Sequence, residues 1–327
     1  MISSHAPDAG QDTPGRRPAR SGARRRFRTA LVLLAALSVA VGIDAAVVAA
    51  RVDQVDVDLT RGPGDADGRT WVLVGLDSRA SLPDGADVRD FGTPEAVPGA
   101  RADVIVVVHQ TDAGTTAFSV PRDLRAFNGR SVGRLAVSWL DGPASTVSAL
   151  CRLGIPTDHL VTVDLAGFTA MVDAVGGVTV DVPRPVRDPA AGLLLRSTGA
   201  VHVDGATALG LIRSRHPEHL TGGVWTPAAV DPDGRAAAAG AVLSALLDGV
   251  HGAALRPWQL QAVAWAASGA VTVDPGTSVT DLIALAGAGI GPVGVLPVSE
   301  PVGSTLTRLP TADTAAALAA AGLACAG

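Results

Sequence analysis

The sequence predicts an α/β fold, a three-layer α-β-α sandwich around a mixed central sheet, preceded by one N-terminal transmembrane helix. Apolar, β-branched runs at residues 71–76 and 104–109 are typical of buried strands. Segments of helical length alternate with further runs of this kind, which indicates a sheet covered by helices on both faces. Residues 29–50 are apolar except for Ser38 and Asp44, and a helix of this length spans a hydrocarbon core.

Seven arginines precede the apolar stretch and predict the orientation of the chain. Basic residues beside a membrane span stay in the cytoplasm, so we expect residues 1–28 to be a cytoplasmic tail and 29–50 a signal anchor. The rest of the chain would then lie outside the cell membrane. A cleaved signal peptide is the alternative, because small residues such as Ala45 and Ala49 could suit a peptidase.

Residues 51–70 contain Gly, Pro and Asp and are expected to be a linker. Residues 71–327 show no internal repeat and no change in composition, so we expect one domain. We expect strands in this domain at 71–76, 104–109, 116–120, 160–164, 178–182, 270–273 and 293–297, and helices at 145–153, 165–174, 204–211 and 235–250.

The chain has two cysteines, Cys151 and Cys325. An exported domain can form a disulfide between them, whereas the alternative is two small buried side chains. The spacing leaves both possibilities open.

The charged residues exclude some classes of function. The chain has no lysine, which excludes a Schiff base and the lysine-containing phosphate loop of many nucleotidases. Acidic residues outnumber arginines after residue 50, whereas nucleic-acid binding requires a broad basic surface. We therefore expect no nucleic-acid partner.

Arginine and aspartate occur together where predicted strands meet loops. Guanidinium groups match phosphate oxygens, and carboxylates can hold Mg²⁺, so the pattern predicts a pyrophosphate and metal site. The residues concerned are Asp77 and Arg79, Arg101 and Asp103, Arg122 and Asp123, then Arg213, Arg215 and Arg235.

In this order along the chain, the motifs resemble those of the LytR-CpsA-Psr family. The G-x-D-S-R motif of that family is similar to residues 75–79, and its S-I-P-R-D motif to residues 119–123. Further matching segments are 101–104, 154–168, 172–180, 213–216 with Trp225, and 233–235.

The resemblance implies a magnesium-dependent phosphotransferase of the cell wall. Such an enzyme moves a glycan from a polyprenyl-pyrophosphate carrier in the membrane onto peptidoglycan and releases polyprenyl phosphate. Asp77 and Asp103 would hold Mg²⁺, and Asp103 or Asp123 would help to deprotonate the acceptor. The pyrophosphate would be bound by Arg79, Arg101, Arg122, Arg213, Arg215 and Arg235, of which Arg122 and Arg213 would also act in catalysis.

The resemblance also implies an apolar tunnel for the lipid, for which Phe168, Met171 and Val175 are candidate lining residues, although each could equally be plain core. The chain departs from the family at residues 236–239, where alanines replace an arginine and glutamines. Two alternatives therefore stay open: an anchored protein that binds polyprenyl-phosphate lipids or wall glycan without turnover, and a hydrolase of the pyrophosphate.

Overall fold

The structure is a computed structural model that describes residues 20–61, 68–86, 91–127, 132–229, 231–303 and 305–325. The chain divides into two compact units at Val47 and Val48. The first contains most of helix α1 (Arg20–Ala50), whose segment Arg26–Ala50 has a mean hydropathy of 2.5. Its large apolar side chains, such as Leu33 and Ile43, are exposed. This helix is a candidate membrane span and matches the predicted single-pass anchor.

The second unit contains a mixed sheet of seven strands in the order β1-β14-β7-β2-β3-β4-β15. Its centre is β2 (Arg69–Leu76), which pairs antiparallel with β3 (Ala102–Thr111) and parallel with β7 (His159–Val163). The other strands are β4 (Gly114–Ser119), β14 (Val271–Val273), β15 (Gly294–Val295) and β1 (Asp53–Gln54). The predicted central strands therefore form, within about two residues of the expected bounds.

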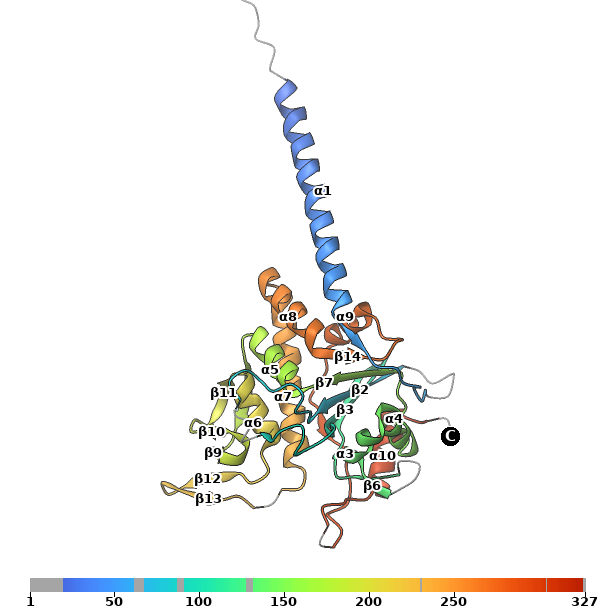
Figure 1. Cartoon of the computed structure of the whole chain (residues 1–327), viewed down its shortest axis with the longest axis vertical. Helices are drawn as coiled ribbons and strands as arrows, with labels where there is room; N and C mark the ends of the chain where they lie inside the picture. Colours follow the sequence, from blue (N-terminus) through green and yellow to red (C-terminus); the bar gives the residue numbers. More distant parts are fainter. Residues whose placement is uncertain are drawn as a thin grey trace, which may run out of the picture. The chain divides into compact units, whose positions relative to one another are not determined.

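Successive side chains along the central strands point alternately to the two faces of the sheet. On one face, Val72 and Ile105 belong to a core with residues of α3 (Leu135–Ser138), α4 (Pro143–Arg152) and α10 (Ala312–Ala320). On the other face, Val106 and Val108 pack with α5 (Leu165–Ala174), α7 (Gly234–Ala253) and α9 (Val279–Gly287). Figure 1 shows the two helical layers on opposite sides of the sheet, as the sequence predicted.

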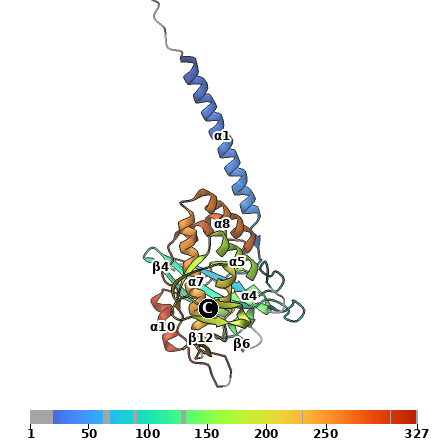
Figure 2. The same cartoon turned by 90° about the vertical axis from the view of Figure 1, so that its left-hand side faces the viewer.

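A further apolar cluster, which we call the second apolar cluster, does not belong to either face core. It joins α5 and α7 to α6 (Gly205–Arg213). It is covered by two small antiparallel sheets, β11-β8 and β10-β9-β12-β13. The strands are β8 (Val178–Val182), β9 (Val186–Asp188), β10 (Leu193–Leu195), β11 (Gly199–Val203), β12 (Glu218–Thr221) and β13 (Val224–Pro227). Helix α8 (Pro257–Ala270) packs on α5, and both lie at the same end of the domain in Figure 2. Strand β8 thus forms where it was expected, but outside the central sheet.

Part of the segment predicted as a linker packs on the domain. Strand β1 pairs with β14, and Val55, Val57 and Leu59 pack against the first core. The backbone of Thr157 donates a hydrogen bond of 2.7 Å to Thr60. Residues 62–67 of the same segment lie outside the described residues.

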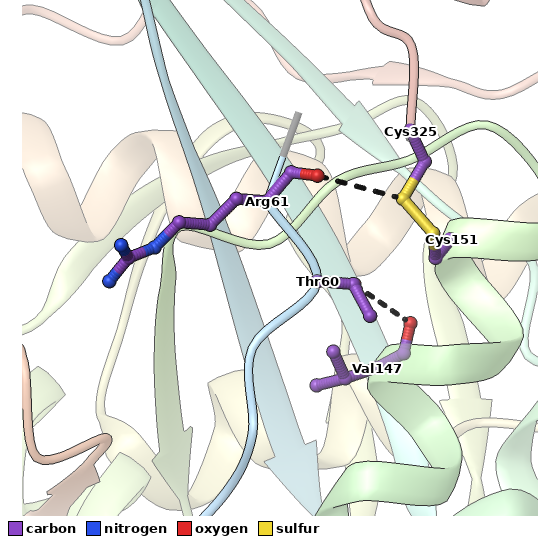
Figure 3. Close-up of a disulfide and its surroundings, with 5 residues drawn as sticks. All are labelled: Thr60, Arg61, Val147, Cys151 and Cys325. Carbon is purple, nitrogen blue, oxygen red and sulfur yellow. Dashed lines mark hydrogen bonds between the residues drawn. A yellow bond between two sulfur atoms is a disulfide. The ribbon is translucent and has the colours of Figure 1, made fainter. Parts of the chain in front are cut away.

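Cys151 and Cys325 form a disulfide, with their Cα atoms 5.3 Å apart. Figure 3 shows that it lies beside Thr60 and Arg61, where the Thr60 hydroxyl donates to the carbonyl of Val147. The bond therefore fastens the C-terminal end to α4, close to the segment that leads into the domain.

Candidate active site

Three arginines from separate parts of the chain meet at Asp103, near the start of β3. Arg122, just after β4, lies 2.6 Å from one carboxylate oxygen. Arg235, in the first turn of α7, lies 3.3 Å from the other oxygen, and Arg215, after α6, lies 3.5 Å from it. The sheet and the α6-α7 layer thus bring together residues that are more than 130 positions apart.

The charges at this site favour an anionic ligand. Burial raises the pKa of Asp103, but the attraction of Arg122, Arg235 and Arg215 outweighs burial and holds the pKa below its usual value. Burial and repulsion from Arg122 and Arg215 lower the pKa of Arg235. Three guanidinium groups therefore share one ionised carboxylate, and the excess positive charge can be neutralised by phosphate oxygens.

A small cavity of about 40 Å³ adjoins these groups and is lined by Asp103, Arg122 and Arg235 among others. The Nε of Arg122 is buried and forms no hydrogen bond with another described residue; Oδ2 of Asp123 lies 3.7 Å away. A buried donor without an acceptor is costly. An oxyanion in this cavity would satisfy it.

Asp77 lies next to this cluster at the neighbouring strand end. Leu76 pairs with Ala102, and the backbone nitrogen of Asp77 donates a 2.9 Å hydrogen bond to the carbonyl of Arg101. The Asp77 carboxylate is 2.5 Å from Arg79. The ends of β2 and β3 therefore bring the predicted metal-binding pair, Asp77 and Asp103, to one edge of the sheet.

A second group of arginines gathers at Phe91. The guanidinium of Arg213 stacks on the Phe91 ring, 3.7 Å from its centroid, and Nε of Arg79 donates to the Phe91 carbonyl at 3.0 Å. The half-buried Arg101 is tied to this region through its backbone bond with Asp77. Five of the six predicted arginines therefore form two groups, with Arg122, Arg215 and Arg235 at Asp103 and with Arg79 and Arg213 at Phe91.

Asp123 lies on the other side of Arg122. One of its oxygens accepts a hydrogen bond of 2.8 Å from Arg134, and the other lies 3.7 Å from Nε of Arg122. Its side chain is 24% exposed, so an acceptor in solution can reach it.

Asp188, which no local sequence pattern indicates, holds the loop after α6 in place. Its buried carboxylate accepts hydrogen bonds from the Ser214 hydroxyl and from the backbone nitrogens of Arg215 and His216, at 2.8 to 2.9 Å. Burial raises the pKa of Asp188, but these hydrogen bonds outweigh burial and lower it. Nothing in the local sequence marks this aspartate, because its partners lie more than 25 residues away.

No local sequence pattern indicates Arg308 either. Its side chain is 3% exposed, forms an ion pair with Asp233 and donates to the Ser299 carbonyl at 2.6 Å. Its backbone nitrogen donates to the carbonyl of Asp123 at 3.0 Å. Arg308 therefore connects the turn before Arg235 to the corner that carries Arg122, and it also lines the small cavity.

The donor set fits Mg²⁺ shared with a phosphate ligand. No group of three or more His, Cys, Asp or Glu that could hold a metal occurs among the described residues. Mg²⁺ commonly takes one or two carboxylates and completes its shell with water and substrate phosphates. Asp77 and Asp103 supply that number of carboxylates at one edge of the sheet.

The candidate lipid-lining residues lie in the second apolar cluster. Val175 is buried there, and Phe168 and Met171 on α5 are half-buried against it. They lie on the side of the central sheet that α5 and α7 cover.

Comparison with known proteins places these residues in a family. The model of the LytR_cpsA_psr family matches residues 38–224, more than half of the chain. The solved "LytR-Csp2A-Psr enzyme from Actinomyces oris" is 34% identical, with a TM-score of 0.70, and the match covers 84% of this chain and 99% of that one.

Two curated proteins are similar over shorter regions. "Probable cell wall biosynthesis protein LcpB" of Corynebacterium glutamicum is 32% identical over 50% of this chain and 40% of its own length. The "Polyisoprenyl-teichoic acid--peptidoglycan teichoic acid transferase TagU" of Halalkalibacterium halodurans is 30% identical over 33% of this chain and 38% of its own. The chain thus spans about two fifths of the length of these curated relatives.

Proposed function

The chain belongs to the LytR-CpsA-Psr family, and from this premise we propose that it moves a glycan from a polyprenyl-pyrophosphate carrier onto cell-wall peptidoglycan. The observation that carries the proposal is the cluster of Arg122, Arg215 and Arg235 on the single carboxylate of Asp103. Transferase activity on a wall polymer is named for one curated relative, which supports this reaction class.

In the proposed mechanism, Asp103 holds the three guanidinium groups in place before the substrate binds. Pyrophosphate oxygens then accept hydrogen bonds from these arginines. One donor is the Nε of Arg122, which forms no hydrogen bond with a described residue. Arg79 and Arg213, gathered at Phe91, supply positive charge from the neighbouring loop. Guanidinium groups fixed in this way stabilise the charge that grows on the phosphoryl oxygens during transfer.

The transfer step is a displacement at the phosphorus that carries the glycan. The oxygen of an acceptor hydroxyl forms a new bond to this phosphorus, the bond to the polyprenyl phosphate oxygen breaks, and polyprenyl phosphate leaves with that electron pair. The proton of the hydroxyl passes to a carboxylate. We assign this role to Asp123 rather than Asp103, because three arginines lower the pKa of Asp103 and weaken it as a base.

Asp77 and Asp103 are the residues that would hold Mg²⁺, which would neutralise pyrophosphate charge when bound. The lipid tail would lie against the second apolar cluster, near Phe168, Met171 and Val175. The seven arginines ahead of the apolar stretch 29–50 would keep the N-terminus in the cytoplasm and the domain outside, where peptidoglycan is.

The test uses the full-length protein in detergent with Mg²⁺, a polyprenyl-pyrophosphate glycan and soluble peptidoglycan fragments. The proposal predicts that glycan phosphate appears on the fragments and that polyprenyl phosphate is released in equal amount. The Arg122→Gln variant should lose most of this turnover. Free glycan phosphate without transfer would instead identify a pyrophosphate hydrolase.

A second candidate function is a binding protein without turnover. Ala236 and Ala239 line the small cavity beside Arg235, where the family has longer donor side chains. Fewer donors mean weaker stabilisation of phosphoryl charge. Tight binding of the lipid with no product of either kind would favour this function.

A further inference from the structure

A second, larger hollow lies outside the arginine cluster. It is lined by the hairpin of β5 (Arg125–Phe127) and β6 (Val132–Arg134), by the C-terminal end of α4, and by Pro310. Its volume is about 310 Å³, against about 40 Å³ for the cavity at Asp103. Ligand pockets begin at roughly 300 Å³, so this hollow can hold part of an oligosaccharide, whereas the smaller cavity suits only a phosphoryl group.

The lining of this hollow combines an aromatic ring with two arginines. Phe127 is 40% exposed, and the guanidinium of Arg152 lies 4.7 Å from the centroid of its ring. Arg125 is exposed as well, and neither arginine forms an ion pair with a described residue. The described lining contains no carboxylate. Such a surface favours a ligand that has apolar sugar faces and negative charge.

The hairpin connects this hollow to the phosphate site. Arg125 pairs with Arg134 and Phe127 with Val132, and residues paired directly across two strands have their side chains on the same face. Arg134 on this face reaches back to Asp123, at 2.8 Å. Phe127 lies four positions after Asp123, at most about 13 Å of extended chain, a span that a short oligosaccharide covers.

We propose that this hollow, lined by Arg125, Phe127 and Arg152, is the binding site of the acceptor, a peptidoglycan strand whose free stem-peptide carboxylates pair with the two arginines. The inference rests on the proposed function. The strand would lie along the face of the β5-β6 hairpin and present a sugar hydroxyl beside Asp123, while the lipid-linked donor occupies the arginine cluster.

The experiment measures binding of soluble, uncross-linked peptidoglycan strands to the full-length protein in detergent, without any lipid substrate. We expect the Arg125→Gln/Arg152→Gln variant to bind these strands at least about tenfold more weakly, because charged hydrogen bonds are lost. Phe127→Ala should also weaken binding. Arg196→Gln, which removes another exposed arginine, is the matched control and should bind like the wild type. Strands with amidated carboxylates should bind the wild type as weakly as they bind the double variant.

Transfer kinetics separate this inference from the proposed function. The double variant should raise the KM for the acceptor with little change in kcat, and should bind the polyprenyl-pyrophosphate glycan as well as the wild type. Equal strand binding by wild type and double variant would overturn the inference while leaving the transferase intact. Loss of donor binding instead of acceptor binding would also overturn it. If neither the wild type nor the double variant transfers glycan, the proposed function fails, whatever the strand binding shows.

Discussion

At the residue scale, Asp103 supplies the negative charge that offsets the repulsion within the arginine cluster. Its carboxylate is shared by Arg122, Arg215 and Arg235, and no other described carboxylate contacts Arg215 or Arg235. Like charges gathered in a partly buried site repel one another when their counter-charge is removed. The Asp103 carboxylate therefore places a negative charge where the substrate pyrophosphate is proposed to add its own.

Asp103→Asn should lower the free energy of unfolding by roughly 1–3 kcal/mol, because the three arginines lose their counter-charge. Inorganic pyrophosphate, added without Mg²⁺, should raise the melting temperature of the variant more than that of the wild type. Thermal denaturation with and without pyrophosphate measures both effects, with Asp181→Asn at an exposed position as the control. Identical pyrophosphate shifts in variant and wild type would contradict the role of Asp103 as the counter-charge of these arginines.

Asp188 predicts part of the pH dependence of stability. Its pKa is lowered in the folded protein, so its contribution is present above the unfolded value of about 4 and is lost as the pH falls through the folded value. Asp188→Asn should be less stable at pH 6 and should lose less stability between pH 6 and pH 3. Urea unfolding at both pH values measures the difference. An unchanged acid dependence would contradict this role of the carboxylate.

The arginines and aspartates of the site could be predicted from the sequence, because each lies at a strand or helix end with a recognisable local pattern. Their grouping could not. Arg213 and Arg215 are two residues apart, yet one stacks on Phe91 and the other contacts Asp103. Asp188 and Arg308 have no local signal at all, since their partners come from distant segments.

At the scale of elements, the start of α7 depends on the C-terminal segment. Arg308 forms an ion pair with Asp233, which precedes the helix, and its side chain also donates to the carbonyl of Ser299. Asp233, Gly234 and Arg235 follow one another, so this contact positions Arg235 indirectly. The segment that does so lies well beyond residue 224, where the match to the family model ends.

Arg308→Gln should destabilise the protein by about 2–4 kcal/mol, because it leaves buried carbonyl acceptors without a donor. Asp233→Asn, at a half-exposed position, should cost less than about 1 kcal/mol but should still lower kcat. Urea unfolding measures the loss of stability, and transfer kinetics measure the loss of turnover. Arg308→Lys, which keeps a positive charge, should retain more turnover than Arg308→Gln. Full activity in Asp233→Asn would show that the ion pair does not position Arg235.

The disulfide joins elements on the same side of the sheet. Cys151 is in α4 and Cys325 follows α10, a separation of 174 residues. Replacing both cysteines with serine should lower the free energy of unfolding by about 2–4 kcal/mol, chiefly by loosening the constraint on the unfolded chain. Urea unfolding with and without reductant tests this, because reductant should affect only the wild type. Equal stability of both proteins in the absence of reductant would contradict it.

Strands buried on both faces were predictable because they are continuous β-branched runs, as in β2 and β3. The strands β9 and β10 were not, because they lie in a Pro- and Gly-rich segment of three-residue strands. Strand β8 has the expected bounds, but it pairs with β11 rather than the central sheet. Pairing between distant strands depends on tertiary packing, which a local pattern does not contain.

At the scale of the whole molecule, the proposed reaction gives a role to three features: the apolar helix would anchor the chain in the membrane, the arginine-rich edge of the sheet would bind a pyrophosphate, and the larger hollow would bind a glycan. In the proposed function, a lipid-linked donor and a wall acceptor would meet at the outer surface of the membrane. A domain anchored there by one helix can reach both.

The most direct test of the central claim is to trace a labelled phosphorus atom from the donor to the product. The full-length protein is incubated with Mg²⁺, peptidoglycan fragments and a polyprenyl-pyrophosphate glycan labelled at the phosphorus next to the sugar. The account predicts that the label enters a phosphodiester between glycan and fragment, and that this product is lost in Arg122→Gln and kept in Arg196→Gln. Label that stays on the lipid in the wild type, despite tight binding, would contradict the account and identify a binding protein.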